Sequence, residues 1–184
     1  MRVLTALSGD TPLSLPRCRY TAPTFHVDDV FMAYWLMKSE PSEVSIDDLA
    51  SFPDQTVGWY GVRNYQARNF MRDQMRPGDG VLFYHSSCAE PGVAGIAKIV
   101  GAPYPDPTQF ESGGKYFDEK ATEALPRWFQ VDVKLVKKTR LLPLSELRAH
   151  PDLQEMRILA KGNRLSITPV SPSEWRTIQK LLEL

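Results

Sequence analysis

The order of strand-like and helix-like segments is the feature that most constrains the fold of this chain. Short apolar runs typical of buried strands are interrupted by segments whose apolar residues recur with a helical period, without regular strand–helix–strand alternation. The expected strands cover 34–37, 81–84, 93–100, 128–135 and 165–170. This mixture predicts an α+β fold, in which a small, strongly bent mixed sheet or barrel has helices at its flanks.

Three segments carry helix signals. Ser45 precedes Asp48 by three residues, the spacing of a capping box, so we expect a short helix there that ends before Pro53. Over residues 65–75 the apolar side chains fall on one helical face, and arginines form a second stripe. A last amphipathic helix is expected from Ser173 onward.

The charge balance limits how the chain can bind an anion. With 22 basic and 22 acidic side chains among 184 residues, the formal net charge is zero. This excludes a histone-like protein that holds nucleic acid by bulk charge, so an anion must bind at a local patch. The basic run from Lys134 to Arg140 is typical of a solvated face, and together with the arginine stripe it predicts a positive rim around a pocket.

The cysteine count and the hydropathy pattern exclude further classes. Cys18 and Cys88 are too few for a disulfide framework, and no paired Cys and His set is typical of a metal site. We therefore expect no metal, no cofactor and a cytoplasmic location. No run approaches the roughly 18 consecutive apolar residues of a spanning helix, which excludes an integral membrane protein.

Residues 1–31 differ in character from the rest of the chain. They hold three prolines and keep neither a helical nor a strand period, which predicts a poorly ordered leader before a single domain over residues 32–184. Asp10 and two of the prolines interrupt the apolar stretch that a signal peptide needs. Met32 opens the first apolar strand and is the alternative start of the protein.

Two clusters could carry chemistry. Residues 58–69 mix aromatic, arginine and asparagine side chains, which can stack on a base, hold a phosphate and bind a base edge. A core position for Trp59 and a solvated arginine face explain this cluster equally well. In the second cluster, residues 83–87, the neighbouring His85 and Ser86 point to opposite faces of a strand, which disfavours a base–nucleophile pair.

Several ordered motifs resemble those of the EVE domain, and the resemblance runs from about Tyr34 to the C-terminus. The motifs are WLMKSEP (35–41), WYGVRNYQARNF (59–70), FYHS (83–86), PRW (126–128) and RLSITPV (164–170). The resemblance implies a PUA-like fold, a bent mixed β-barrel flanked by helices and related to YTH and ASCH domains. It also implies a non-catalytic module that binds a modified base, chiefly a modified cytosine in DNA, with RNA as the alternative polymer.

The resemblance further implies which side chains surround the base. The pocket residues are Lys38, Ser39, Trp59, Asn64, Tyr84, His85 and Ser86, with Tyr116 or Trp128 closing the cavity. Because the chain has no net charge, the phosphate contacts are expected from Arg63, Arg68 and Arg72.

Two other functions remain as alternatives. ASCH relatives include hydrolases of modified pyrimidine nucleosides, and such an activity would need Lys38 or His85 as the acid or base. A protein-interaction adaptor with a vestigial pocket is the second alternative, for which Trp59→Ala would harm stability and no ligand binding. Protein partners and oligomeric state are left open by the sequence.

Overall fold

The computed structural model describes residues 32–184. The predicted leader over residues 1–31 lies outside the described residues and stays a prediction. The described part of the chain forms a six-stranded sheet, in the order β2, β7, β4, β3, β1, β8, and a two-stranded sheet of β5 and β6. The strands are β1 (Tyr34–Ser39), β2 (Thr56–Gly58), β3 (Gly80–His85), β4 (Gly92–Ile99), β5 (Tyr104–Pro105), β6 (Phe129–Gln130), β7 (Asp132–Pro143) and β8 (Ile167–Val170).

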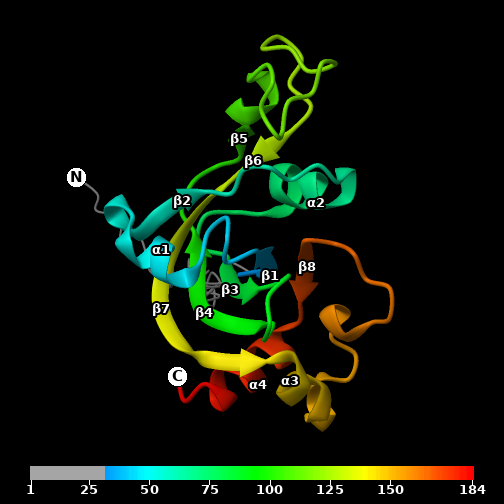
Figure 1. The fold of residues 1–184 in the computed structure, drawn as a ribbon. Coiled ribbons are helices and arrows are strands. Elements are labelled where there is room, and N and C mark those ends of the chain that lie inside the picture. The colour runs from blue at the N-terminus through cyan, green and yellow to red at the C-terminus, as the bar shows by residue number, and fades with distance from the viewer. Residues whose placement is uncertain (1–31) are drawn as a thin grey trace, which may run out of the picture. The chain divides into compact units, whose positions relative to one another are not determined.

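The large sheet curls into part of a barrel. β7 is 12 residues long and sweeps around the outside of the curl, with β4 beside it (Figure 1). The register between β4 and β7 shifts at Val93/Gly95 and again at Ile96/Ala97. Because each shift bends the strand and increases its twist, these irregularities produce the curvature. The predicted α+β class with a bent mixed sheet is confirmed.

Strand β1 lies inside the sheet, between β3 and β8. It pairs in parallel with β3, so that Lys38 is opposite Tyr84 and Ser39 is opposite His85. It pairs antiparallel with β8. A strand that is covered on both faces reads as a continuous apolar run, which is why residues 34–37 show no alternation.

Each face of the sheet packs against its own core. On one face Trp35 and Met37 of β1 join Phe83 and the buried residues near α1 and α2. On the other face Leu36 joins Tyr84 and the buried side of α3 and α4. Because successive side chains of a strand point to opposite faces, the Ser39 side chain lies on the face of the first core and the Lys38 side chain on the face of the second.

Short helices cover both faces, as Figure 1 shows. They are α1 (Ile46–Ser51), α2 (Tyr65–Asn69), α3 (Leu144–Ala149) and α4 (Pro172–Leu181), with 3-10 turns η1 (Pro53–Gln55), η3 (Pro107–Phe110), η4 (Pro151–Leu153) and η5 (Arg157–Leu159). The helix predicted over 65–75 is α2 followed by a π-helical turn, η2 (Phe70–Gln74), in which the Met75 amide donates to the Phe70 carbonyl. Within residues 32–184 no helix has the length and apolar character needed to cross a bilayer.

The strand predicted over 128–135 is divided in two. β6 pairs with β5 in a small lobe, and the chain resumes as β7 in the large sheet after Val131. The backbone N–H of Trp59 donates to the Val131 carbonyl at 2.8 Å, which fixes the segment after β2 against this junction. The lobe thereby lies beside residues 59–63, where polar and aromatic side chains gather.

Candidate functional site

A cavity of about 240 Å³ opens where β1 and β2 end, and we name it the aromatic cavity. Its lining comes from the end of β1 and the turn after it, from the segment that follows β2, from the lobe loop and from the residue before β8. These residues are Lys38, Ser39, Glu40, Glu43, Val44, Val57, Gly58, Trp59, Tyr60, Gly61, Val62, Arg63, Lys115, Tyr116 and Ser166.

Three aromatic rings form its walls. Trp59 is only 8% exposed and packs edge-to-face on Phe83, with ring centres 5.5 Å apart. Tyr60 and Tyr116 meet at 70° with ring centres 6.1 Å apart, and Tyr60 is the more exposed of the two. Planar aromatic faces at a cavity provide stacking surfaces for a flat ligand.

Gly61 lets the Tyr116 ring approach the backbone. Its φ of +79° belongs to the left-handed region, and a Cβ added there would lie 2.7 Å from Cζ of Tyr116. Its N–H donates to Oδ2 of Asp106 at 2.9 Å. A glycine is therefore required at this position both for backbone conformation and for space.

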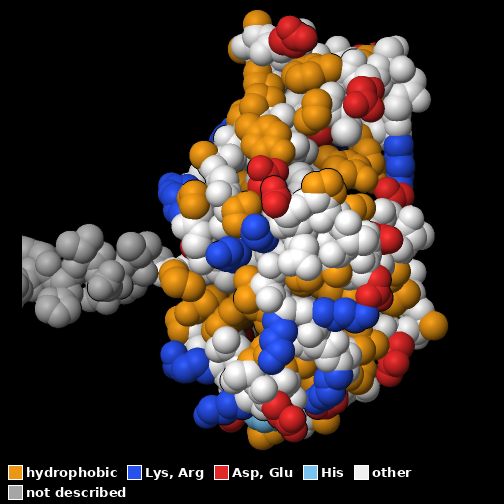
Figure 2. All heavy atoms as spheres, turned by 90° about the vertical axis from the view of Figure 1, so that its left-hand side faces the viewer, with side chains coloured by type: hydrophobic (Ala, Val, Ile, Leu, Met, Phe, Trp, Pro, Cys, Tyr) orange, Lys and Arg blue, Asp and Glu red, His pale blue; other side chains and the backbone are white. Residues whose placement is uncertain are grey.

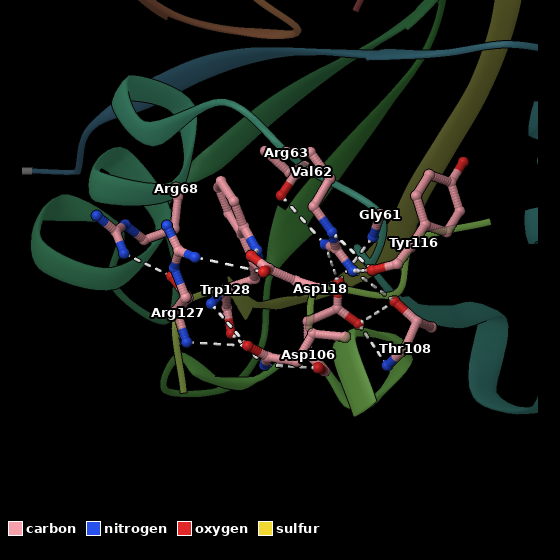
Figure 3. A network of polar contacts seen from close by, with 11 residues as sticks. Gly61, Val62, Arg63, Arg68, Asp106, Thr108, Tyr116, Asp118, Arg127 and Trp128 are labelled. Carbon is pink, nitrogen blue, oxygen red and sulfur yellow. Dashed lines mark hydrogen bonds and ion pairs between the residues drawn. The ribbon is translucent and has the colours of Figure 1, made fainter. Parts of the chain in front are cut away.

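A buried ion pair holds this wall (Figure 3). Nη1 of Arg63 donates to Oδ2 of Asp106 at 2.8 Å, and Asp106 is 1% exposed. Nη2 donates to the Thr108 hydroxyl at 3.0 Å, while Nε donates to the Tyr116 carbonyl at 2.9 Å. Burial opposes ionisation of Asp106, but the hydrogen bonds from Arg63, Thr108 and Gly61 outweigh it and lower the pKa of this carboxyl.

The polar groups of the aromatic cavity include both donors and acceptors. The Ser39 hydroxyl donates to the Val44 carbonyl at 2.6 Å, which leaves its oxygen able to accept. Lys115 pairs with Glu43 at 2.6 Å, and this hydrogen bond lowers the pKa of the Glu43 carboxyl. The cavity can therefore hydrogen-bond the edge of a flat heterocycle between its aromatic walls.

The structure brings only part of the predicted pocket together. Lys38, Ser39, Trp59 and Tyr116 line the aromatic cavity, as does Arg63. Asn64, Tyr84, His85, Ser86 and Trp128 are not among its lining residues. The structure therefore places these five side chains outside the lining of the aromatic cavity.

Asn64 and His85 serve as helix caps. Oδ1 of Asn64 accepts from the Ala67 amide at 3.1 Å at the start of α2. Nε2 of His85 accepts from the Ile46 amide at 3.0 Å at the start of α1, which requires a neutral imidazole. Burial lowers the pKa of His85 and so favours that neutral form.

Trp128 supports the lobe from behind the cavity wall. Its indole N–H donates to Oδ2 of Asp118 at 2.7 Å, and its ring stacks on Tyr65 with centres 4.9 Å apart. The Arg63 guanidinium lies 5.4 Å from the ring centres of both Trp128 and Tyr116. Trp128 therefore positions Arg63 and, through it, the Tyr116 wall.

Tyr84 and Ser86 line a second cavity on the other face of β1.

The three arginines predicted to hold phosphates already have protein partners. Arg63 is committed to Asp106, Thr108 and Tyr116. Arg68 donates to Asn69 and to the Arg127 carbonyl. Arg72 pairs with Asp73 at 2.7 Å on the surface. Of these, Arg72 is the most exposed, so a nucleic acid could recruit it most easily, whereas Arg63 has no free donor.

Sequence reasoning missed Tyr60, Glu43 and Asp106. Tyr60 belongs to the mixed aromatic and polar cluster 58–69 but was not assigned to the pocket. Asp106 was not singled out, although Asp106-Pro107-Thr108 has the pattern of a capped turn, with proline at the first helical position. Within residues 32–184, no three His, Cys, Asp or Glu side chains gather as metal ligands.

Comparison with known proteins adds a family and relatives. The sequence profile described as the EVE domain matches residues 33–181. Human thymocyte nuclear protein 1 is 43% identical over 169 residues, which cover 82% of this chain and 74% of that protein. The solved structure of a hypothetical protein from Leishmania major superposes with a TM-score of 0.78 at 48% identity, covering 83% of this chain and 95% of the other.

A further solved structure is human thymocyte nuclear protein 1 in complex with DNA containing 5-methylcytosine. It has a TM-score of 0.76 and 43% identity, and the match covers 83% of this chain and 98% of that one. The predicted PUA-like fold is confirmed by these neighbours.

The predicted cytoplasmic location is wrong by the same comparison. Relatives from human, chicken and mouse, at 42–43% identity, are named thymocyte nuclear protein 1. The prediction rested on the low cysteine count. Nuclear and cytosolic proteins share a reducing environment, so cysteine usage does not separate the two compartments.

Proposed function

Since the chain belongs to the EVE domain family, as its motifs predicted, we propose that it is a non-catalytic module that binds a modified base, most readily a modified cytosine in DNA. The base enters the aromatic cavity. The same domain of human thymocyte nuclear protein 1, 43% identical, has been solved with DNA containing 5-methylcytosine.

The observation that carries this proposal is the match between the aromatic cavity and a single flat ring. Its volume of about 240 Å³ lies below the roughly 300–1,000 Å³ of sites for drug-sized ligands. Aromatic rings line it beside the Ser39 hydroxyl and the Glu43 carboxylate. A flipped base needs a stacking face and polar groups at its edge, and this cavity offers both.

The energetics favour modest affinity with selectivity from the modification. Extruding a base from a duplex costs a few kcal/mol, and stacking returns about 1–3 kcal/mol per base. Burying one extra methyl group adds about 0.8 kcal/mol, which corresponds to a roughly fourfold preference. Larger selectivity requires hydrogen bonds at the base edge in addition to methyl burial.

Two observations on His85 support binding rather than catalysis. The Nε2 atom of His85 is occupied by the Ile46 amide, and His85 is not among the lining residues of the aromatic cavity. Of the two acid or base candidates that the sequence suggested, only Lys38 lines the aromatic cavity. The hydrolase alternative would then depend on Lys38 alone.

The test is a fluorescence-anisotropy titration with matched oligonucleotides that carry cytosine, 5-methylcytosine, 5-hydroxymethylcytosine or N6-methyladenine, each as DNA and as RNA. We expect the tightest binding to DNA with a modified cytosine. Equal affinity for all of them would refute the proposal.

A matched pair of variants links the binding to the cavity. Tyr60 lines it and is 40% exposed, whereas Phe117 is 43% exposed and lies outside it. Tyr60→Ala is expected to lower affinity for the preferred oligonucleotide, because it removes a stacking face, and Phe117→Ala is expected to leave it unchanged. Equal effects of the two substitutions would assign the binding to another surface.

A further inference from the structure

A second cavity, of about 430 Å³, lies on the other face of β1 and β3, and we name it the basic cavity. Its polar lining is Lys38, Tyr84, Ser86, Arg148, Lys161 and Asn163. Lys38 lines both cavities, so they approach each other at the end of β1. The amide of Ser86 donates to the Ser39 carbonyl at 2.9 Å, which ties the two linings together.

The charge of the basic cavity is not balanced by the protein. Lys38, Arg148 and Lys161 form no ion pair with any residue from 32 to 184, and none of the lining residues is acidic. Elsewhere in the described residues, six basic side chains form ion pairs with carboxylates. Lys138 pairs with Asp47, for example, and Figure 2 shows blue and red side chains interspersed on the face that it presents. In the run 134–140, Lys138 and Arg140 are paired, whereas Lys134 and Lys137 form no ion pair within the described residues. The charge of the predicted positive rim is therefore compensated only in part.

Two polar groups in this cavity make no hydrogen bond to the protein within the described residues. Tyr84 is 2% exposed, and its hydroxyl makes no hydrogen bond within the described residues. The half-buried Lys38 ammonium has none there either, and burial lowers its pKa. The Tyr84 hydroxyl and the Lys38 ammonium are therefore both free to donate to an anionic acceptor that enters from outside.

The far wall of the cavity is held in shape by Asn163. Its Nδ2 donates to the Arg157 carbonyl at 2.8 Å, and its Oδ1 accepts from the Leu165 amide at 3.0 Å. These bonds close the loop that carries Lys161, with Gly162 at a φ of +81° as its turn. Lys161 thus stands on a braced loop opposite Arg148 of α3, and an ammonium and a guanidinium around one space are suited to a phosphate.

We propose that the basic cavity binds a phosphate group of the same strand whose modified base occupies the aromatic cavity. This inference rests on the proposed function. The phosphate accepts from Lys38 and the Tyr84 hydroxyl at the inner end and is neutralised by Arg148 and Lys161 at the mouth. It replaces the role that the sequence suggested for Arg63.

The test measures how affinity for the preferred oligonucleotide depends on salt. Arg148→Gln and Lys161→Gln remove exposed charges that line only the basic cavity. Together they are expected to reduce the slope of log K against log salt by about 0.7–0.9, the contribution of one phosphate contact, and each alone by part of that. Lys98→Gln is the matched control, because Lys98 is exposed and lines neither cavity. Slopes of all three variants equal to that of the unaltered protein would overturn the inference.

A second arm distinguishes a strand phosphate from a free one. An oligonucleotide with a neutral methylphosphonate at one linkage beside the modified base should bind the unaltered protein more weakly. The Arg148→Gln/Lys161→Gln double variant should bind this oligonucleotide and the one with an unmodified backbone with equal affinity. If no linkage is sensitive while inorganic phosphate competes for the cavity, the site takes a free ion and the inference is wrong.

The two proposals fail in different readouts. The affinity ratio of modified to unmodified oligonucleotide reports on the aromatic cavity and should be the same in the double variant as in the unaltered protein. A ratio near one in the unaltered protein refutes the proposed function. An unchanged salt slope refutes the phosphate site while that ratio persists.

Discussion

Replacing Asp106 by asparagine tests whether the buried ion pair holds the aromatic cavity. Asp106 accepts from Arg63, from the Gly61 amide and from both the amide and the hydroxyl of Thr108. An asparagine keeps the volume but replaces one acceptor oxygen with an NH₂ group that faces other donors. Breaking a buried pair from one side costs about 3–5 kcal/mol, and because Arg63 is 23% exposed we expect the lower end, about 3 kcal/mol.

Urea unfolding measures this cost. With a denaturant slope of about 2 kcal/mol/M, a loss of about 3 kcal/mol lowers the midpoint by roughly 1.5 M. Asp73→Asn is the matched control, since it breaks the exposed pair with Arg72 and should leave the midpoint unchanged. A decrease of less than about 0.5 M for Asp106→Asn would refute the reasoning.

The pH dependence gives a second measure of the same pair. The folded protein lowers the pKa of Asp106. Its stabilisation is therefore fully present above the unfolded value of about 3.9 and is lost as pH falls through the folded value. Between pH 5 and pH 2 the unaltered protein should lose more stability than Asp106→Asn does. Parallel losses would indicate that other carboxylates dominate acid unfolding.

Three further substitutions test other parts of the structure. Gly61→Ala should cost about 1–2 kcal/mol of folding stability through the left-handed backbone alone, and it should also displace Tyr116 and weaken oligonucleotide binding. Gly113→Ala is the control: Gly113 has a similar φ of +81° and nothing within 4 Å, so this substitution should lower stability without affecting binding. Equal binding by both variants would contradict the proposed wall. His85→Ala should lower the folding stability by about 1 kcal/mol, because a helix cap is lost, without changing the preference for the modified base. Because folding lowers the pKa of His85, the unaltered protein should lose stability as pH falls below about 6.5. The variant should lose less, which thermal melts at pH 7.5 and pH 5.5 would reveal. Trp59→Ala should cost about 3–5 kcal/mol. Trp59→Leu, which keeps an apolar side chain and removes the stacking ring, is therefore the variant for titration, and unchanged binding by it would show that Trp59 does not stack on the base.

Much of the fold follows from local sequence signals. The capping box at Ser45 and Asp48 is formed, and the apolar runs at 34–37 and 81–84 lie in the central strands. The π-turn after α2 and the division of the predicted strand 128–135 were not predicted. The division depends on contacts with distant segments, such as the bond from the Trp59 amide to the Val131 carbonyl, that leave no periodic trace in the local sequence.

The candidate site was predictable in residue type more than in arrangement. Ser39, Trp59 and Tyr116 line one cavity as the family resemblance implied. Tyr84 and Ser86 were assigned to the same cavity, but β3 pairs with β1 in register and presents Tyr84 beside Lys38 on the other face. Whether two strand ends contribute to one cavity or to two depends on the pairing register, which the sequence of either strand does not contain.

The pairing of β1 with β8 also bears on how the protein is made. Residues 34–37 leave the ribosome early, yet they complete their hydrogen bonds only with residues 167–170. Until then β1 presents an open, apolar edge to other nascent chains, and such edges template aggregation. A ribosome that stalls before residue 167 would therefore release an aggregation-prone fragment. Chaperones should bind most strongly to chains that end between β3 and β8.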